Sequence, residues 1–328
     1  MPNTEREIKI IEQKTLMPEF WDNIKNSKIL MKRLSHLKEK DEKYSRLTIG
    51  WNDMNNLCDL AIEEKDESIL PDILEMFNCF KKDLDELKLE ALLSDEFGRN
   101  NAILSLHTDS KDEQSKAWVQ MLFKMYSEWA EKKGFSVYRF CEGLQSIEFR
   151  VIGKYACGYL RGEKGVHQLS KLSKTQDDIC SYEVSVDVVP ELDDDDEKLY
   201  GTPEDYMLSQ FCTRNSRGHY CTYQLVHIPT GLKVWSDGGK SAYEVKSLML
   251  KVMKSRLFEI MMKENLERIE DIKEIQPDKA LNDKIRSYIY YPCKMVRDHR
   301  TNVENANVES VLNGEINEFL MAYLNMPK

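Results

Sequence analysis

The chain has 328 residues, of which 41% are hydrophobic and 32% are charged, and its formal net charge is −10 at pH 7. This length exceeds what one hydrophobic core usually organises, so two or three domains are expected in a globular, helix-rich protein. The acidic balance argues against an evenly basic nucleic-acid-binding protein, but it is compatible with one locally basic domain.

The start and the interior of the sequence lack secretion and membrane signals. No apolar run is long enough to span a bilayer, and residues 1–11 lack the basic start and apolar block of a secretory signal. The eight cysteines show no C-x-x-C spacing, and none neighbours a histidine in a metal-ligand pattern. We therefore expect a non-secreted protein with no membrane partner, no metal and no cofactor. Cys212 and Cys221 could meet across a hairpin, but reduced thiols are the favoured interpretation.

Residues 5–94 are predicted to be helical over almost their whole length. Two helices cover roughly 22–46 and 50–64, and a third helix follows Pro71. The third helix carries one apolar stripe, formed by Ile73, Phe77, Phe80, Leu84, Leu87 and Ala91. Short polar breaks between such helices favour an antiparallel bundle, which would act as a spacer or a docking arm.

Strands and helices alternate after residue 100. Residues 101–107 alternate like a strand, and the next helix ends near Gly134. One face of that helix carries Trp118, Met121, Leu122, Met125 and Trp129. The segments FSVYRF, SIEFRVIG and SYEVSVDVVPE add strands, which together predict an α+β domain. The acidic run of residues 193–197 is interpreted as a solvated linker.

Residues 199–277 are predicted to form a third unit. It begins with a loop, continues with a hairpin in TYQLVHIPTGLKVWSDG, and ends in a helix from about Ser241 to Lys273. The buried side of that helix is expected to carry Val245, Leu248, Met249, Val252, Leu257, Ile260 and Met261. Residues 285–324 then supply a strand, a polar loop and a closing helix.

Seven short motifs, in order along the chain, resemble one known family. They are PEFWD (18–22), NNAIL (100–104), MYSEWAEKKGF (125–135), YACGYLRGEKGVHQL (155–169), HIPTG (227–231), IRSY (285–288) and DHRTNVE…VLNGEINEFL (298–320). The series resembles a bacterial-type class-I peptide chain release factor of the type-two branch. The resemblance implies an α+β release-factor fold with a helical domain (1–97), an α+β superdomain that reads the codon (98–198 with 278–328), and a smaller α+β domain (199–277).

The positions that carry the chemistry of that family are altered in this sequence. Counted back from the HIPTG motif, the family's Gly-Gly-Gln is replaced by Cys212, Thr213 and Arg214. Its glycines allow backbone conformations that are closed to other residues. The codon-reading Ser-Pro-Phe is replaced by Ser173, Lys174 and Thr175, the segment 177–184 lacks the expected histidine, and a polar loop replaces the glycine-rich turn after residue 107. We therefore expect a degenerate paralogue, not an enzyme, that has lost peptide release.

RNA binding without hydrolysis is the leading functional hypothesis. The candidate contacts are Arg214, Arg217, His219, Tyr220, Lys240, Lys246, Arg161, Lys171 and Lys174. Arginine pairs with phosphate and stacks on bases, and tyrosine or histidine rings also stack. The RNA would be messenger or ribosomal. A plastid branch of the family that lacks both tripeptides is associated with transcript stabilisation, so the expected compartment is the plastid stroma in a plant and the cytoplasm otherwise.

Three alternatives remain. The protein could occupy the ribosomal A site without hydrolysis, in rescue, stalling or regulation, or it could be an interaction scaffold whose helical arm binds protein partners. An enzyme that uses Cys212, Cys221 or His219 is the weakest alternative, because no base–nucleophile pair with an orienting acid is visible. No sequence pattern indicates an oligomeric state.

Overall fold

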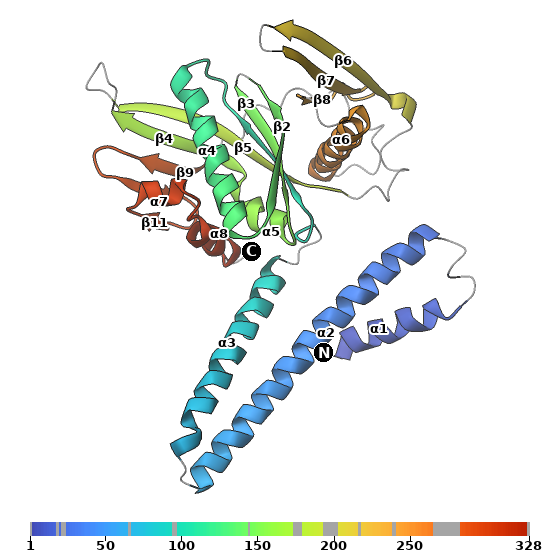
Figure 1. Cartoon of the computed structure of the whole chain (residues 1–328), viewed down its shortest axis with the longest axis vertical. Coiled ribbons are helices and arrows are strands. Elements are labelled where there is room, and N and C mark those ends of the chain that lie inside the picture. Colours follow the sequence, from blue (N-terminus) through green and yellow to red (C-terminus); the bar gives the residue numbers. More distant parts are fainter. Residues whose placement is uncertain are drawn as a thin grey trace. The chain divides into compact units, whose positions relative to one another are not determined.

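A computed structural model describes residues 2–17, 20, 24–64, 67–93, 97–143, 145–172, 179–192, 203–215, 218–237, 241–264 and 283–326. The chain divides into two compact units, Met1–Ala91 and Leu92–Lys328 (Figure 1). The expected boundary after residue 97 and the separation of 199–277 as its own domain stay predictions. None of the described helices is long and apolar enough to cross a membrane.

The first unit is built from helices α1 (Pro2–Thr15), α2 (Ile24–Glu64) and α3, which runs over Leu70–Leu93 after a short 3-10 turn at Glu67–Ile69. The predicted break between residues 46 and 50 is wrong, because α2 continues through Gly50. A single glycine costs a helix only about 1 kcal/mol relative to alanine, which a long helix tolerates.

Helices α2 and α3 pair antiparallel, as predicted. As residue numbers rise along α2, from Lys43 through Arg46 to Trp51, the residue numbers of their partners on α3 decrease. The contacts are Lys43 Nζ to Glu90 Oε1 at 2.6 Å, Arg46 Nε to Asp83 Oδ2 at 3.6 Å, and the rings of Trp51 and Phe80 at 5.6 Å. The predicted apolar stripe is only partly covered, since Phe77 remains 45% exposed.

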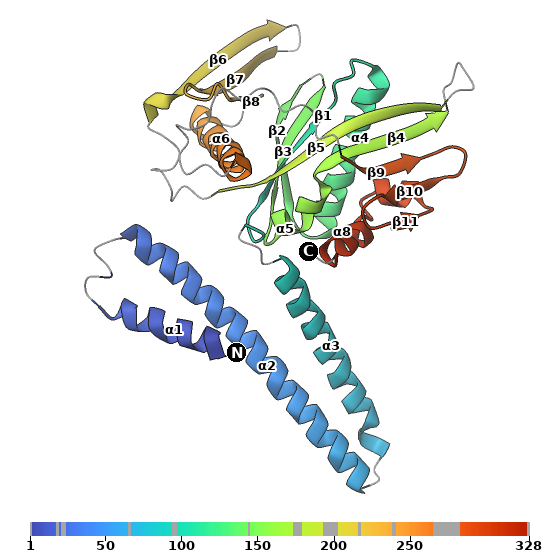
Figure 2. The same cartoon turned by 180° about the vertical axis from the view of Figure 1, so that it is seen from behind.

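An eight-stranded sheet organises the second unit. Its strand order is β11-β10-β9-β4-β5-β1-β3-β2, and the described pairings are antiparallel except the parallel pair β4–β9. The strands are β1 (Ala102–His107), β2 (Ser136–Glu142), β3 (Ser146–Ile152), β4 (Gly165–Leu172), β5 (Ile179–Pro190), β9 (Lys284–Ile289), β10 (Met295–Asp298) and β11 (Glu304–Asn305). The last three come from the C-terminal segment and lie beside β4 (Figure 2).

Helix α4 (Glu113–Lys132) covers one face of this sheet. Its predicted apolar face is confirmed at Trp118, Leu122, Met125 and Trp129, which are all buried, whereas Met121 is only partly buried. The Trp118 indole Nε1 donates to the His167 carbonyl at 3.0 Å, which ties α4 to β4. The short helices α5 (Ala156–Leu160), α7 (Val308–Leu312) and α8 (Asn317–Leu324), with a 3-10 turn at Arg161–Glu163, complete this layer.

A second, three-stranded sheet follows β5 in the chain. It consists of β6 (Tyr206–Asn215), β7 (Gly218–His227) and β8 (Lys233–Ser236) in that order, after a 3-10 turn at Pro203–Asp205. The predicted hairpin in residues 222–238 is confirmed as β7–β8. The predicted loop before it is wrong, because most of it forms β6. Its residues pair with β7 from Tyr206 opposite His227 to Asn215 opposite Gly218.

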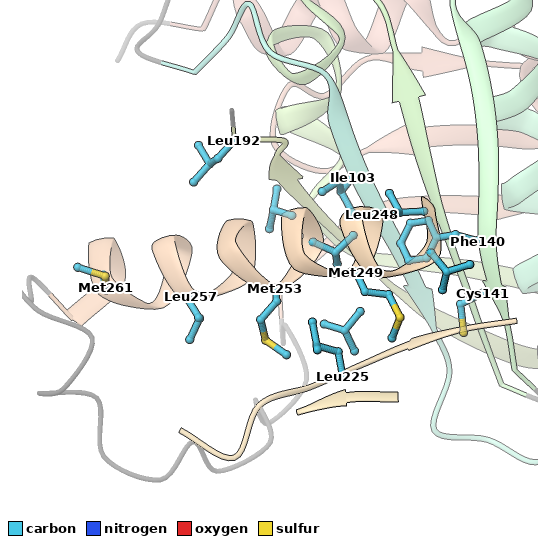
Figure 3. Packing of buried hydrophobic residues seen from close by; sticks show 14 residues of the cluster. Ile103, Phe140, Cys141, Leu192, Leu225, Leu248, Met249, Met253, Leu257 and Met261 are labelled. Carbon is cyan, nitrogen blue, oxygen red and sulfur yellow. The ribbon is translucent and has the colours of Figure 1, made fainter. Parts of the chain in front are cut away.

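Helix α6 (Ala242–Glu264) packs on one face of this small sheet. Six of its seven predicted core residues are buried, the exception being the partly buried Ile260. Figure 3 shows Leu225 of β7 facing Met249 and Met253 of the helix, and Phe140 of β2 at the same cluster. The two sheets of this unit therefore share one hydrophobic cluster. The expected extension of the helix to Lys273 lies outside the described residues.

Candidate functional site

The β6–β7 hairpin contains the positions that the sequence singled out. Its register runs from Tyr206 opposite His227 to Asn215 opposite Gly218. Cys212 lies directly opposite Cys221 with 4.2 Å between their Cα atoms, and the two form a disulfide. This corrects the expectation of reduced thiols for this pair, because antiparallel pairing brings directly opposed residues close enough to bond. It also removes both sulfurs as free nucleophiles for the enzyme alternative.

The backbone brings the predicted RNA contacts together at the end of this hairpin. Thr213 lies opposite Tyr220, and Arg214 lies opposite His219. The side chains of residues 213–220 fall outside the described part of the structure, as does Arg217 altogether. The register thus gives only the backbone pairing of these positions, and both their clustering and their role in binding stay predictions.

The three-stranded sheet differs sharply in charge from the rest of the chain. Residues 206–236 contain Arg214, Arg217 and Lys233 but no aspartate or glutamate, although the chain has 57 acidic residues. A segment of this kind concentrates positive potential on a protein that is acidic overall. The small sheet is therefore a locally basic element of the kind that the acidic overall composition still allowed.

The HIPTG turn anchors the base of the hairpin. His227 is buried, and its Nδ1 lies 2.8 Å from the Thr230 hydroxyl. The Ile228 amide donates to the Asp205 carbonyl at 2.8 Å, and Gly231 adopts a φ of +69° that favours glycine. Burial lowers the pKa of His227, partly offset by Asp205, so this ring is a structural part of the turn at neutral pH.

The remaining RNA-binding candidates do not form one cluster in the described structure. Lys246 is exposed near the start of α6. Lys171 on β4 donates to Gln114 and lies over the Tyr182 ring, and Arg161 donates to the Leu92 carbonyl at 3.3 Å. No described contact joins the side chains of Lys246, Lys171 and Arg161 to one another. Lys174, Lys240 and the codon-reading positions Ser173, Lys174 and Thr175 lie outside the described residues.

Several further cations hold α6 against the large sheet. The Arg256 guanidinium donates to Glu148 at 2.7 Å and to Ser105 at 3.0 Å. Lys164, directly before β4, pairs with Asp187 of β5 at 2.5 Å and also with Glu259 of α6. Burial opposes the charge on Lys164, yet these two carboxylates raise its pKa above its ordinary value. These groups therefore stabilise the packing of the helix.

Two segments that depart from the family pattern meet at a polar cavity of about 420 Å³. Its lining includes His107 at the end of β1, Asp109 from the loop that follows, and Glu183 from β5. The Thr108 hydroxyl donates to the Glu183 carbonyl at 2.9 Å, and His107 Nε2 lies 3.0 Å from Asp109 Oδ1. Sequence reasoning marked both segments but gave no reason to place them side by side. Within the described ranges, no group of three or more His, Cys, Asp or Glu side chains is placed to hold a metal ion.

Sequence reasoning also missed an exposed aromatic pair on the small sheet. The rings of Phe211 on β6 and Trp235 on β8 have their centroids 6.1 Å apart. Phe211 is 52% exposed and Trp235 is 39% exposed. No local pattern in the sequence pairs the two rings, because their pairing depends on β6 being recognised as a strand.

Comparison with known proteins defines the family. Residues 4–179 match the PCRF domain. Peptide chain release factor 2 of Clostridium perfringens strain SM101 is 34% identical over 323 residues, which cover 93% of this chain and 87% of that protein. The chain belongs to the peptide chain release factor family. Peptide chain release factor 2 of Staphylococcus aureus strain N315 is 31% identical over 337 residues, covering 99% of this chain and 91% of that protein.

The release-factor fold is shown as well. The structure of RF2 of Thermus thermophilus superposes with a TM-score of 0.73 and 24% identity, covering 99% of this chain and 95% of that one. The predicted α+β release-factor fold is therefore confirmed.

Family membership overturns the prediction that the chain is not an enzyme. Relatives that match the chain over nearly its whole length are named for the release of peptide chains. The prediction rested instead on a few altered positions, chiefly 173–175 and 212–214. A difference confined to such short segments does not establish that the activity of the family is lost.

Proposed function

We propose that this release-factor-family protein binds RNA through the end of the β6–β7 hairpin and that its partner is the ribosome. The observation that carries the proposal is the absence of acidic residues from 206–236, in a chain whose net charge is −10. RNA is a polyanion, so a basic segment on an acidic protein directs it to one surface and repels it elsewhere.

Each group at the hairpin end suits contact with RNA. Arg214 and Arg217 would pair with phosphates through their planar guanidinium groups, and Tyr220 and His219 would stack on unpaired bases. The disulfide lies close to this end, and the HIPTG turn holds its base. Paired strands that a disulfide already ties together lose little conformational freedom on binding, which favours affinity.

The names of the relatives make ribosomal RNA the first source to test. A transcript outside the ribosome is the second candidate, located in a plastid if the chain comes from a plant. The observation that favours it is the replacement of the codon-reading tripeptide by Ser173, Lys174 and Thr175. Both candidates use the same basic hairpin end, so one pair of variants tests both.

The test measures co-sedimentation with ribosomes and the anisotropy of a fluorescent single-stranded RNA. The double variant Arg214→Ala/Arg217→Ala removes two cations from the hairpin. The control Lys294→Ala/Arg297→Ala removes two exposed cations from the same unit, at a distance in sequence from the small sheet. Because each phosphate contact adds about 0.7 to the salt slope for single strands, the hairpin variant should flatten that slope by roughly 1.4.

Equal binding by wild type and the hairpin variant would refute the proposal. Peptide release at a stop codon, measured with the same preparations, would support the ribosomal setting. Binding to free transcripts together with no sedimentation on ribosomes would instead support the second candidate.

A further inference from the structure

The small sheet has one covered face and one open face. Leu225 is buried against α6 in the hydrophobic cluster (Figure 3), and Val234 belongs to the same buried cluster. Side chains alternate along a strand, so residues one position away point to the opposite face. The register places Phe211 beside Thr222, and Trp235 beside Gln224. All four therefore lie on the face away from α6.

Two aromatic rings dominate this open face. Phe211 and Trp235 come from the two outer strands, and their planes are inclined by 34°. Their exposures of 52% and 39% leave much of each ring in contact with solvent. Thr222 and Gln224 of the central strand lie between them and are only partly buried. The surface thus combines flat apolar rings with hydroxyl and amide groups that can form hydrogen bonds.

The charge around the rings identifies the kind of ligand. Lys233 is exposed two residues before Trp235 on the same strand, so it shares the open face. The whole sheet lacks acidic side chains, and its hairpin end adds Arg214 and Arg217. Rings surrounded by cations and amides match the unpaired bases and phosphates of a single strand. In an A-form duplex the bases are stacked inside, where these rings cannot reach them.

We propose that the open face of the β6–β7–β8 sheet is a stacking platform for unpaired RNA bases, with one base on Phe211 and the next on Trp235. This rests on the proposed RNA binding and extends it from the hairpin end to the body of the sheet. Lys233 neutralises the phosphate that accompanies the stacked bases, and Gln224 contacts base edges. The platform favours single strands of any sequence, because every base presents a flat face.

The test uses the full-length chain and a 5′-fluorescein 12-residue oligoadenylate. Phe211→Ala and Trp235→Ala should each weaken binding at least about fivefold, which corresponds to the lower bound of roughly 1 kcal/mol for one base–ring stack. Met207→Ala is the matched control, because Met207 is on the same face and is 51% exposed but has no ring. Trp235→Phe should keep most of the affinity.

Tryptophan fluorescence supplies a second readout that a merely structural role would not alter. Oligoadenylate should quench wild-type emission, and Trp235→Phe should abolish that quenching while the protein still binds. This conservative variant keeps the test decisive even where an alanine variant fails to fold.

The outcomes separate the platform from the proposed function. Unchanged affinity in both alanine variants, with binding still lost in Arg214→Ala/Arg217→Ala, overturns the platform alone. Equal affinity for duplex and single-stranded RNA also overturns it. A wild-type protein that binds neither ribosomes nor any RNA overturns both proposals.

Discussion

Replacing Arg286 with methionine should destabilise the second unit by about 3–5 kcal/mol, the usual cost of leaving a buried charge without its partner. The Arg286 guanidinium donates to both oxygens of Glu163 at 2.7 Å and to Asp298 at 3.2 Å. The side chains of all three residues are at most 1% exposed. Methionine has a similar length but cannot compensate either carboxylate.

Most of the lost stability should come from Glu163, which would keep fewer partners than Asp298. Asp298 keeps Arg300 at 2.9 Å, whereas Glu163 would retain only the Tyr126 hydroxyl at 3.0 Å. In the native protein burial opposes ionisation of Glu163, but Arg286, assisted by His167 and Tyr126, outweighs it and holds the pKa of this carboxyl below its usual value. The native pair therefore stabilises the fold above the unfolded-state pKa and loses that contribution as pH falls through the folded-state pKa.

Without Arg286 the sign reverses, because burial alone raises the pKa of Glu163. The deficit of the variant relative to wild type should then shrink as pH is lowered from 8 towards 5. The assay is urea unfolding followed by tryptophan fluorescence across that range. Arg297→Met is the control, since its guanidinium is 45% exposed and pairs with Glu304 at 3.4 Å, which is worth less than about 1 kcal/mol.

A double variant tests the physical cause directly. Glu163→Gln removes the stranded charge and preserves an acceptor for Tyr126, so Arg286→Met/Glu163→Gln should be at least about 1 kcal/mol more stable than Arg286→Met alone. A deficit that does not change with pH, or a double variant that loses the sum of the two single losses, would refute the reasoning.

Three further predictions follow from single sites. Gly314→Ala should lower the free energy of unfolding by about 2 kcal/mol or more, because its φ is +87° and an added Cβ would lie 2.6 Å from a backbone nitrogen of α4. Gly231→Ala should cost only about 1 kcal/mol, because its φ is +69° but the space around it is open. Thermal unfolding of the two variants compares these costs. Thiol titration of the denatured chain should find six free groups before reduction and eight after it, because Cys141 and Cys157 are buried in the folded protein. Breaking Cys212–Cys221 should speed amide exchange in β6 and β7, with a cost of about 2–3 kcal/mol. Burial lowers the pKa of His167 to about 4 from 6.5, so stability should fall as pH drops through that window, by roughly 3 kcal/mol at most, and His167→Gln should flatten the curve; an equally steep curve would contradict this assignment.

Local periodicity was sufficient to predict much of the fold. The helical spacing of large apolar residues such as Trp118 and Trp129 predicted α4 and its buried face. The buried positions of α6 were nearly all assigned correctly. Gly50 led to the wrong prediction of a helix break, because the low helix propensity of one glycine is a small local effect that a long helix overrides. Strand β6 was missed because its polar and charged residues resemble those of a loop until β7 supplies hydrogen-bonding partners.

The candidate site was harder to predict, because it depends on pairing between distant residues. The bond between Cys212 and Cys221 follows from a register that the sequence does not state. The Phe211–Trp235 pair joins two strands across a third one. Residues 212–214 showed correctly where the sequence departs from its family, but a local substitution could not decide the activity of the whole chain.

The parallel pairing of β4 with β9 determines when the large sheet can be completed during synthesis. Glu163 leaves the translating ribosome 123 residues before Arg286, the cation that it needs, and the whole small sheet is made in the interval. Until β9 arrives, β4 has an unpaired edge and the carboxylate has no counter-charge. Nascent chains that stop inside the small sheet should therefore keep an incomplete large sheet with an unpaired β4 edge. Cellular proteases should degrade them faster than the finished protein.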